Sequence, residues 1–298
     1  MADTPSPSSG APLHDVPIRR VGFIGLGDMG GAIAARIIAA GFPTVLWARR
    51  PAALTRFAGP GVDTAAGPAE LAAVVDYVGI CVWDDDAVRA VVLGEGGVLA
   101  GSRPGTVIAI HSTTSTALCR EMVAAAEQYG VSVIDAAVSG GRDVALAGRL
   151  VVAAGGDAAV IDRCRPVIST FADLIVHLGA VGTGQLAKLI NNTLLAANLA
   201  LAVDALAVGE TLGIPAHALV QVLGRGSGRS VGLEVAIATR SSDDKRQRAL
   251  PLLRKDVRSL ADEVAYDDAA GSLLSAAADV GITRLTAPPG GSSSPQGE

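Results

Sequence analysis

The sequence predicts an α/β fold, in which a doubly wound parallel sheet is followed by an all-helical C-terminal domain. Up to about residue 179, short β-branched runs alternate with Ala-rich helical stretches, which is the rhythm of βαβ units. Beyond that point the strand signals stop, and one long helical pattern begins at Thr183. The composition agrees, because 50% of the 298 residues are hydrophobic, only 3% are aromatic, and 36 glycines allow many tight turns.

The elements of the sheet domain are predicted from these alternating patterns. Strands are expected at Val21–Ile24, Thr44–Trp47, Tyr77–Val82, Thr106–Ile110, Val131–Asp135, Leu150–Ala154 and Leu174–His177. Helices are expected between them at Gly30–Ala40, Asp84–Leu93, Ser115–Tyr129 and Asp157–Thr170. Because strands alternate with helices, the sheet is expected to be parallel.

The chain is expected to divide into a leader, two domains and a tail. Residues 1–17 are rich in Pro, Ser and Ala and lack a basic segment before an apolar core, so they predict a disordered leader rather than a signal peptide. The sheet domain is expected over 18–180 and the helical domain over 181–286, joined by the long helix. A flexible interdomain connection is expected at 224–230, a helical segment over 250–264, and a disordered tail over 287–298.

Charge and cysteine content exclude several classes of function. The net charge of −5 provides no basic field for nucleic acid or an anionic membrane. The apolar run 186–208 has about membrane length, but Lys188 and Asp204 interrupt it. A charged side chain at the middle of a bilayer costs roughly 2.5–3.5 kcal/mol, which favours a buried helix over a membrane-spanning one. The 3 cysteines lack CxxC spacing, and the histidines lack a metal-ligand pattern. We therefore expect a reduced, cytoplasmic protein without a metal.

A glycine-rich loop directly follows the first predicted strand and opens the first helix. It reads Gly25-Leu26-Gly27-Asp28-Met29-Gly30. The first glycine allows a tight turn, the second lets the backbone approach a pyrophosphate, and the third permits close helix–strand packing. An ordinary glycine-rich turn is the alternative. In this context the motif predicts a dinucleotide-binding domain of the Rossmann type.

The residues after the second predicted strand indicate which dinucleotide binds. An NAD-binding domain usually has an acidic residue at this place to bond the ribose 2′-hydroxyl. This chain has Ala48-Arg49-Arg50 instead, and two guanidiniums suit a 2′-phosphate. The sequence therefore favours NADP over NAD, and the alternative is that the arginines are solvated surface charges.

Lys188 and Asn192 lie at i and i+4 near the start of the long helix, among apolar residues. Desolvation lowers the pKa of a buried lysine toward the range that is useful for proton transfer. The alternative is a lysine that reaches solvent, with Asn192 bonding to a neighbouring loop.

A second polar group, Ser139-Gly140-Gly141, follows a predicted strand and is expected at the carboxyl edge of the sheet. A hydroxyl followed by two unhindered amides suits a carboxylate or a developing oxyanion. By itself the segment is equally consistent with a plain turn.

In their order and spacing these motifs resemble the β-hydroxyacid dehydrogenases, the family of 3-hydroxyisobutyrate dehydrogenase, tartronate semialdehyde reductase and the glyoxylate/succinic semialdehyde reductases. The resemblance covers about residues 18–285. The motifs that carry it are Gly25-x-Gly27-x-Met29-Gly30, Ser112-Thr113, Asp135-Ala-Ala-Val-Ser139-Gly-Gly141, Gly148 with Gly155-Gly156, Gly182-x-Gly184-x-x-x-Lys188-x-x-x-Asn192 and Lys255-Asp256.

The resemblance implies roles for several residues. Lys188 is the general acid/base, Asn192 orients it and the substrate, and Ser139, Gly140 and Gly141 hold the substrate carboxylate. Thr113 lies by the nicotinamide and Lys255 borders the cofactor. The C-terminal domain is expected to be like that of 6-phosphogluconate dehydrogenase, and at least a homodimer is expected.

The chain departs from the family pattern near the cofactor and the substrate. It has Val82-Trp83 where the family commonly has Leu-Pro, and Ala48 and Ala137 where Asn and Pro are common. Arg142 adds a cation at the expected substrate edge, where it would favour a second carboxylate or face solvent. These changes leave the identity of the substrate open.

The predicted function is reversible hydride transfer between NADP(H) and a small 3-hydroxyacid or its semialdehyde or keto form. One alternative is an imine reductase-like enzyme, although such enzymes typically lack the lysine. Another is a non-catalytic NADP-binding protein of the same fold.

Overall fold

The computed structural model describes residues 16–240, 243–264 and 269–286. The chain divides into two compact units, residues 1–188 and 189–298, whose boundary falls inside the long helix α8 (Thr183–Thr211). The expected leader, apart from Val16 and Pro17, and the expected tail lie outside the described residues.

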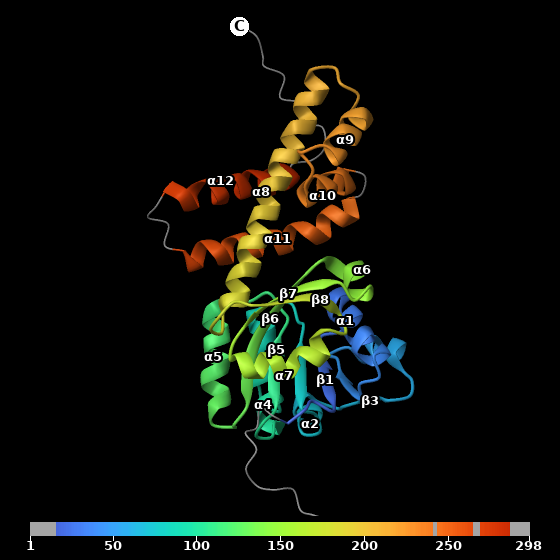
Figure 1. Cartoon of the computed structure of the whole chain (residues 1–298), viewed down its shortest axis with the longest axis vertical. Coiled ribbons are helices and arrows are strands. Elements are labelled where there is room, and N and C mark those ends of the chain that lie inside the picture. Colours follow the sequence, from blue (N-terminus) through green and yellow to red (C-terminus); the bar gives the residue numbers. More distant parts are fainter. Residues whose placement is uncertain (1–15, 241–242, 265–268, 287–298) are drawn as a thin grey trace, which may run out of the picture. The chain divides into compact units, whose positions relative to one another are not determined.

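The first unit is built on an 8-stranded sheet with the order β3-β2-β1-β4-β5-β6-β7-β8 (Figure 1). The strands are β1 (Val21–Ile24), β2 (Thr44–Trp47), β3 (Val62–Thr64), β4 (Tyr77–Ile80), β5 (Val107–Ile110), β6 (Ser132–Ser139), β7 (Leu150–Gly155) and β8 (Ala172–His177). All neighbours are parallel except β6 and β7. The expected parallel sheet is corrected at this pair, because the segment 140–149 is too short for a crossover.

Helices cover both faces of the sheet, as a doubly wound fold requires. They are α1 (Asp28–Ala39), α2 (Pro68–Ala72), α3 (Asp85–Leu93), α4 (Val98–Gly101), α5 (Thr116–Glu127), α6 (Gly141–Leu146) and α7 (Ala158–Ile168), with short 3₁₀ turns η2 (Pro51–Ala53) and η3 (Thr55–Phe57). One buried cluster joins α1, α6 and α7 to the strands, and a second joins α2, α3, α4 and α5 to them. The two clusters form the cores above and below the sheet.

Two strands differ from the sequence prediction by more than one or two residues at an end. β3 was not predicted, because its three residues include exposed polar side chains and give no apolar run. β6 continues through Asp135 to Ser139, so the Asp135–Ser139 motif is a strand rather than a turn. Since Ile110 at the end of β5 pairs with Asp135, the last residues of β6 extend beyond β5 at the carboxyl edge. The expected location of Ser139 at that edge is therefore confirmed.

In its described residues the second unit is built of helices and their connections, with no strand. It contains the rest of α8 with α9 (Ala216–Arg225), α10 (Val231–Arg240), α11 (Asp243–Glu263) and α12 (Ala269–Thr286). Residues 226–230 connect α9 to α10 inside this unit, so the expectation of an interdomain connection at 224–230 was wrong.

Helix α8 is long and apolar enough to cross a membrane by length and composition alone. A core helix of a soluble protein passes the same test, and 44% of its most apolar window is buried. Leu199 and Leu206 of α8 pack with Leu233 of α10 and Leu253 of α11 in one buried cluster. These contacts are those of a core helix.

Candidate active site

The loop between β1 and α1 has the geometry that a dinucleotide pyrophosphate needs. Gly25 has φ +94°, and a Cβ on Gly30 would collide with the carbonyl oxygen of Gly25. A Cβ on Gly27 would meet nothing within 4 Å, so this side of the loop is open. No described side chain caps α1, which leaves its first N–H groups available to an anion. These observations fit a bound dinucleotide.

The other loop residues offer a ligand mainly their backbone. Leu26 is buried in the core, and Met29 is half-buried against the same core cluster. Asp28 is exposed in the first turn of α1. Arg56, which the sequence did not single out, donates from its guanidinium to the carbonyl oxygens of Leu26 and Gly27. Arg56 therefore adds a positive charge beside the loop that no local motif indicates.

The arginines after β2 are free to meet an anion. Arg49 and Arg50 are exposed, and neither guanidinium has a hydrogen bond or ion pair with another described residue. Ala48 is half-buried and packs against the core. There is no acidic residue at this place, where an NAD-binding domain usually has one.

A hydrogen bond joins the segments that follow β4 and β5, close to the glycine-rich loop between β1 and α1. The backbone N–H of Val82 donates to Oγ of Ser112 at 2.8 Å. Trp83 is 58% exposed, which is unusual for so large an aromatic side chain. Thr113 lies between Ser112 and Thr114, and both of these neighbours bond to the side chain of Gln185.

Lys188 and Ser139 meet although 49 residues separate them. Nζ of Lys188, in the second turn of α8, donates to Oγ of Ser139 at 3.1 Å. Gly140 has φ +137°, so the chain turns sharply after Ser139 before α6 begins at Gly141. Both side chains are half-buried. The arrangement places an amine beside a hydroxyl, directly before the turn at Gly140 and Gly141.

In the helical unit, Asn192 and Lys255 share a buried carboxylate. Nδ2 of Asn192 donates to Oδ2 of Asp256 at 2.6 Å, and Nζ of Lys255 lies 3.3 Å from Oδ1. Asp256 is 3% exposed. The contact to Oδ1 is an ion pair without hydrogen-bond geometry. The Lys255-Asp256 motif thus holds Asn192 in place, one helical turn after Lys188 along α8.

Arg142 extends into solvent from the start of α6. Its guanidinium lies 3.4 Å from Oδ1 of Asp143, and the side chain is 57% exposed. Such an exposed pair is weak.

His111 and the three cysteines of the sheet unit have surroundings that suit a structural role. His111 is buried, with Nδ1 2.8 Å from the carbonyl oxygen of Ala136 and Nε2 2.8 Å from the hydroxyl of Tyr77. Burial raises the pKa of Cys81, Cys119 and Cys164 to about 12, which suppresses the thiolate. In the described part of the chain no group of three His, Cys, Asp or Glu could hold a metal ion.

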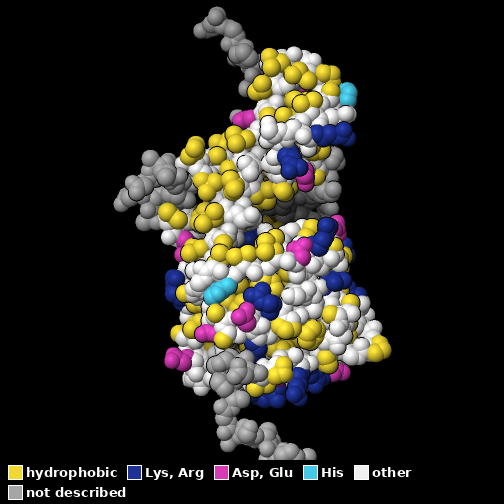
Figure 2. All heavy atoms as spheres, viewed as in Figure 1, with side chains coloured by type: hydrophobic (Ala, Val, Ile, Leu, Met, Phe, Trp, Pro, Cys, Tyr) yellow, Lys and Arg dark blue, Asp and Glu magenta, His cyan; other side chains and the backbone are white. Residues whose placement is uncertain are grey.

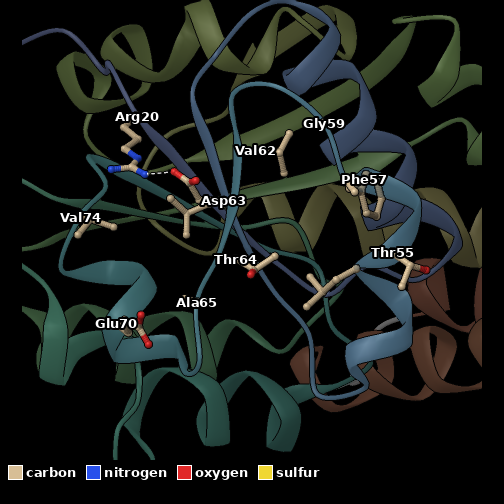
Figure 3. A pocket seen from close by; sticks show the side chains of 13 residues that line it. Arg20, Thr55, Phe57, Gly59, Val62, Asp63, Thr64, Ala65, Glu70 and Val74 are labelled. Carbon is tan, nitrogen blue, oxygen red and sulfur yellow. Dashed lines mark hydrogen bonds and ion pairs between the residues drawn. The ribbon is translucent and has the colours of Figure 1, made fainter.

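A pocket of about 710 Å³ lies beside the edge strand β3 (Figure 3). Arg20 and Asp63 form an ion pair in it, and Phe57 and Glu70 lie on its walls. None of the candidate site residues lines this pocket. This cavity is therefore separate from the residues that the sequence analysis singles out.

Two family models together match most of the chain. The NAD binding domain of 6-phosphogluconate dehydrogenase matches residues 20–179. The NAD-binding domain of NADP-dependent 3-hydroxyisobutyrate dehydrogenase matches residues 182–287.

Relatives and solved structures point to the same family. A probable 3-hydroxyisobutyrate dehydrogenase of Mycobacterium tuberculosis is 33% identical over 87% of this chain and 90% of its own. The solved 3-hydroxyisobutyrate dehydrogenase of that organism, with L-serine, has a TM-score of 0.77 at 31% identity and covers 90% of this chain and 94% of its own. The structure of Psf3 in complex with NADP⁺ and 2-OPP has a TM-score of 0.78 at 25% identity, and the match covers 89% of this chain and 92% of its own.

An imine reductase of Myxococcus stipitatus has a TM-score of 0.60 at 21% identity, covering 89% of this chain and 99% of its own, and shares the fold alone. The family models match both halves of the chain, and several relatives that cover more than two thirds of it are named as hydroxyacid dehydrogenases. The chain therefore belongs to the β-hydroxyacid dehydrogenase family and is an NAD(P)-dependent oxidoreductase.

Proposed function

We propose that this protein transfers a hydride reversibly between NADP(H) and a small 3-hydroxyacid or its semialdehyde or keto form, with Lys188 as general acid/base. The observation that carries the proposal is the contact of 3.1 Å between Nζ of Lys188 and Oγ of Ser139. It brings a proton-transfer group to an anion-holding segment at the carboxyl edge of the sheet, where open α/β folds bind their ligands.

In this proposal the residues of the chain transfer the proton and position the substrate. When bound, the nicotinamide supplies or accepts the hydride at C4. In oxidation, neutral Lys188 removes the proton of the substrate hydroxyl, and in reduction its ammonium form returns that proton to the carbonyl oxygen. Ser139 and the N–H groups of Gly140 and Gly141 hold the substrate carboxylate, so that the reacting carbon is fixed. Asn192, held by Asp256, orients the substrate.

The substrate class is a small acid with a hydroxyl group near its carboxylate. The names of the relatives, which include 3-hydroxyisobutyrate, L-serine and 2-(hydroxymethyl)glutarate dehydrogenases, support this class. An activity panel with 3-hydroxyisobutyrate, glycerate, tartronate semialdehyde, glyoxylate and succinic semialdehyde, each with NADP and NAD, identifies the substrate. Absence of nicotinamide turnover with every compound would support a binding protein instead.

Lys188→Ala tests the catalytic role directly. We expect kcat to fall about 10²- to 10⁴-fold, which is the usual contribution of a general acid/base. The dissociation constant of NADP⁺ should change much less, because the lysine acts on the substrate. Arg120→Ala, at an exposed position on α5, serves as a control. Near-normal turnover of the Lys188 variant would remove it from this role.

The preference for NADP rests on the two exposed arginines after β2. The known complex of Psf3 with NADP⁺ agrees with this choice. Val82, Trp83, Thr113 and Lys255 complete the proposed cofactor contacts. We further propose a cytoplasmic location.

The helical domain is proposed to form a homodimer or a higher homo-oligomer. Exposed apolar side chains of α8 recur at Ile190, Leu194, Leu201 and Val208, and Leu212 directly follows the helix. At about 100° per residue they fall within roughly 40° of one another, so they form one stripe. Figure 2 shows hydrophobic side chains gathered over the visible face of the helical unit. Such a stripe suits a partner subunit.

A further inference from the structure

Asp135 is a buried carboxylate whose partners are backbone groups at the start of α8. It is 0% exposed in the middle of β6. The N–H of Gly182 donates to Oδ1 at 2.6 Å, and the N–H of Gln185 donates to Oδ2 at 2.9 Å. Burial raises the pKa of this carboxyl, and the bonds from the backbone act in the opposite direction. The carboxylate is satisfied by α8.

Through these bonds the side chain of Asp135 caps the N-terminus of a helix that starts 48 residues later in the chain, at Thr183. The first N–H groups of a helix have no partner within it, and a carboxylate there is favoured by the helix dipole. Close approach is possible because Gly184 has no side chain. A Cβ on Gly184 would lie 2.7 Å from Oδ2 of Asp135 and closer still to the carbonyl oxygen of Ala153.

Gln185, in the same first turn, holds a different segment. Its side chain is 0% exposed. Oε1 accepts from the N–H of Thr114 at 3.0 Å, and Nε2 donates to the carbonyl oxygen of Ser112 at 2.8 Å. The two bonds clamp the backbone on both sides of Thr113. The turn that Asp135 fixes therefore also fixes the end of β5.

We propose that Asp135 and Gln185 are positioning residues for hydride transfer, which together make the first turn of α8 a rigid support for Lys188 and for the Ser112–Thr114 segment. Lys188 is the third residue after Gln185, and its Nζ contacts Ser139 at the far end of the strand that carries Asp135. This inference rests on the proposed role of Lys188. A displacement of about 1 Å at reacting groups can cost about 10²-fold in rate.

The test compares Asp135→Asn and Gln185→Met with Asp157→Asn and Lys188→Ala. An Asn at 135 presents an N–H₂ group to backbone donors and loses one bond. Met at 185 keeps the length of the side chain but loses both bonds to the Ser112–Thr114 segment. Asp157→Asn is the control, because Asp157 also caps a helix, α7, by accepting from the N–H groups of Ala159 and Val160. It has no proposed part in the site. All variants are measured well below their melting temperatures.

For Asp135→Asn we expect kcat to fall about 10- to 100-fold while KM for the hydroxyacid changes less than about 3-fold. For Gln185→Met we expect a similar fall in kcat and a rise of about 3- to 10-fold in the dissociation constant of NADP⁺, measured by quenching of tryptophan fluorescence. Asp157→Asn should keep kcat within about twofold and lose little stability, because Asn caps a helix about as well as Asp.

If Gln185→Met and Asp135→Asn, both folded, keep kcat and the NADP⁺ constant within twofold while Lys188→Ala is inactive, the positioning role is overturned and the proposed function stands. An active Lys188→Ala overturns the proposed function itself. If Asp135→Asn does not fold, Gln185→Met alone decides, since it leaves the bonds of Asp135 to α8 intact.

Discussion

His111 is expected to make the stability of the sheet unit depend on pH. It is 2% exposed, and burial lowers its pKa to about 4. A carbonyl oxygen only accepts, so Nδ1 carries the proton toward Ala136 and Nε2 accepts from the hydroxyl of Tyr77. The rings of Phe23 and Phe171 pack against it. The neutral imidazole is therefore fully satisfied, and an imidazolium would be a charge in an apolar core.

The sign and size of the effect follow from proton linkage. Above the unfolded pKa of about 6.5 both states are neutral and the stabilisation is complete. As the pH falls from about 6.5 to about 4, the unfolded chain binds a proton that the folded chain does not, so stability is lost. The difference between these pKa values corresponds to about 3 kcal/mol.

Urea denaturation followed by tryptophan fluorescence measures this loss. Trp47 and Trp83 both lie in the sheet unit, so they report on it. We expect His111→Asn to be less stable than the native chain at pH 7 and to lack about 3 kcal/mol of the native decline between pH 7 and pH 4. His217→Asn, at an exposed histidine of α9, is the control and should follow the native curve. Parallel pH curves for the native chain and His111→Asn would refute the reasoning.

Three other predictions follow from exposed or buried groups. Arg49→Asp should lower the ratio of NADP to NAD turnover about 10- to 100-fold through loss of a charge-assisted bond, and an unchanged ratio would sink the assignment. Leu201→Glu combined with Val208→Glu should shift the protein to monomer in sedimentation velocity, because it puts charges on the apolar stripe of α8; an unaltered oligomer would place the interface elsewhere. Cys119 and Cys164 should resist a thiol reagent at pH 8 until urea is added, since burial raises the pKa of each to about 12, and rapid labelling of the native protein would contradict this.

Local patterns were sufficient where a feature depends on neighbouring residues. The strand before Gly25, the helix after it and the spacing of the glycines define the phosphate loop without distant contacts. The long helix, expected to begin at Thr183, runs from Thr183 to Thr211. The period of the apolar residues and the breaking effect of glycine set both features.

Distant contacts account for what the patterns missed. Asp135 reads as the polar end of a strand, yet β6 continues through it because N–H groups of α8 satisfy the buried carboxylate. The role of Gln185 has no local signal, since its partners lie more than 70 residues away. The short edge strand β3 forms by pairing with β2 rather than by its own propensity.

The sequence by itself determined the α/β class and the glycine-rich loop, and it singled out side chains suited to proton transfer, because periodicity, glycine conformation and side-chain chemistry are local properties. Only the tertiary structure decided that Lys188 meets Ser139, that Asp135 caps α8, and that His111 is a neutral core residue. Each of these depends on burial and on bonds between segments far apart in the chain, and such bonds exist only once the sheet and its helices have packed.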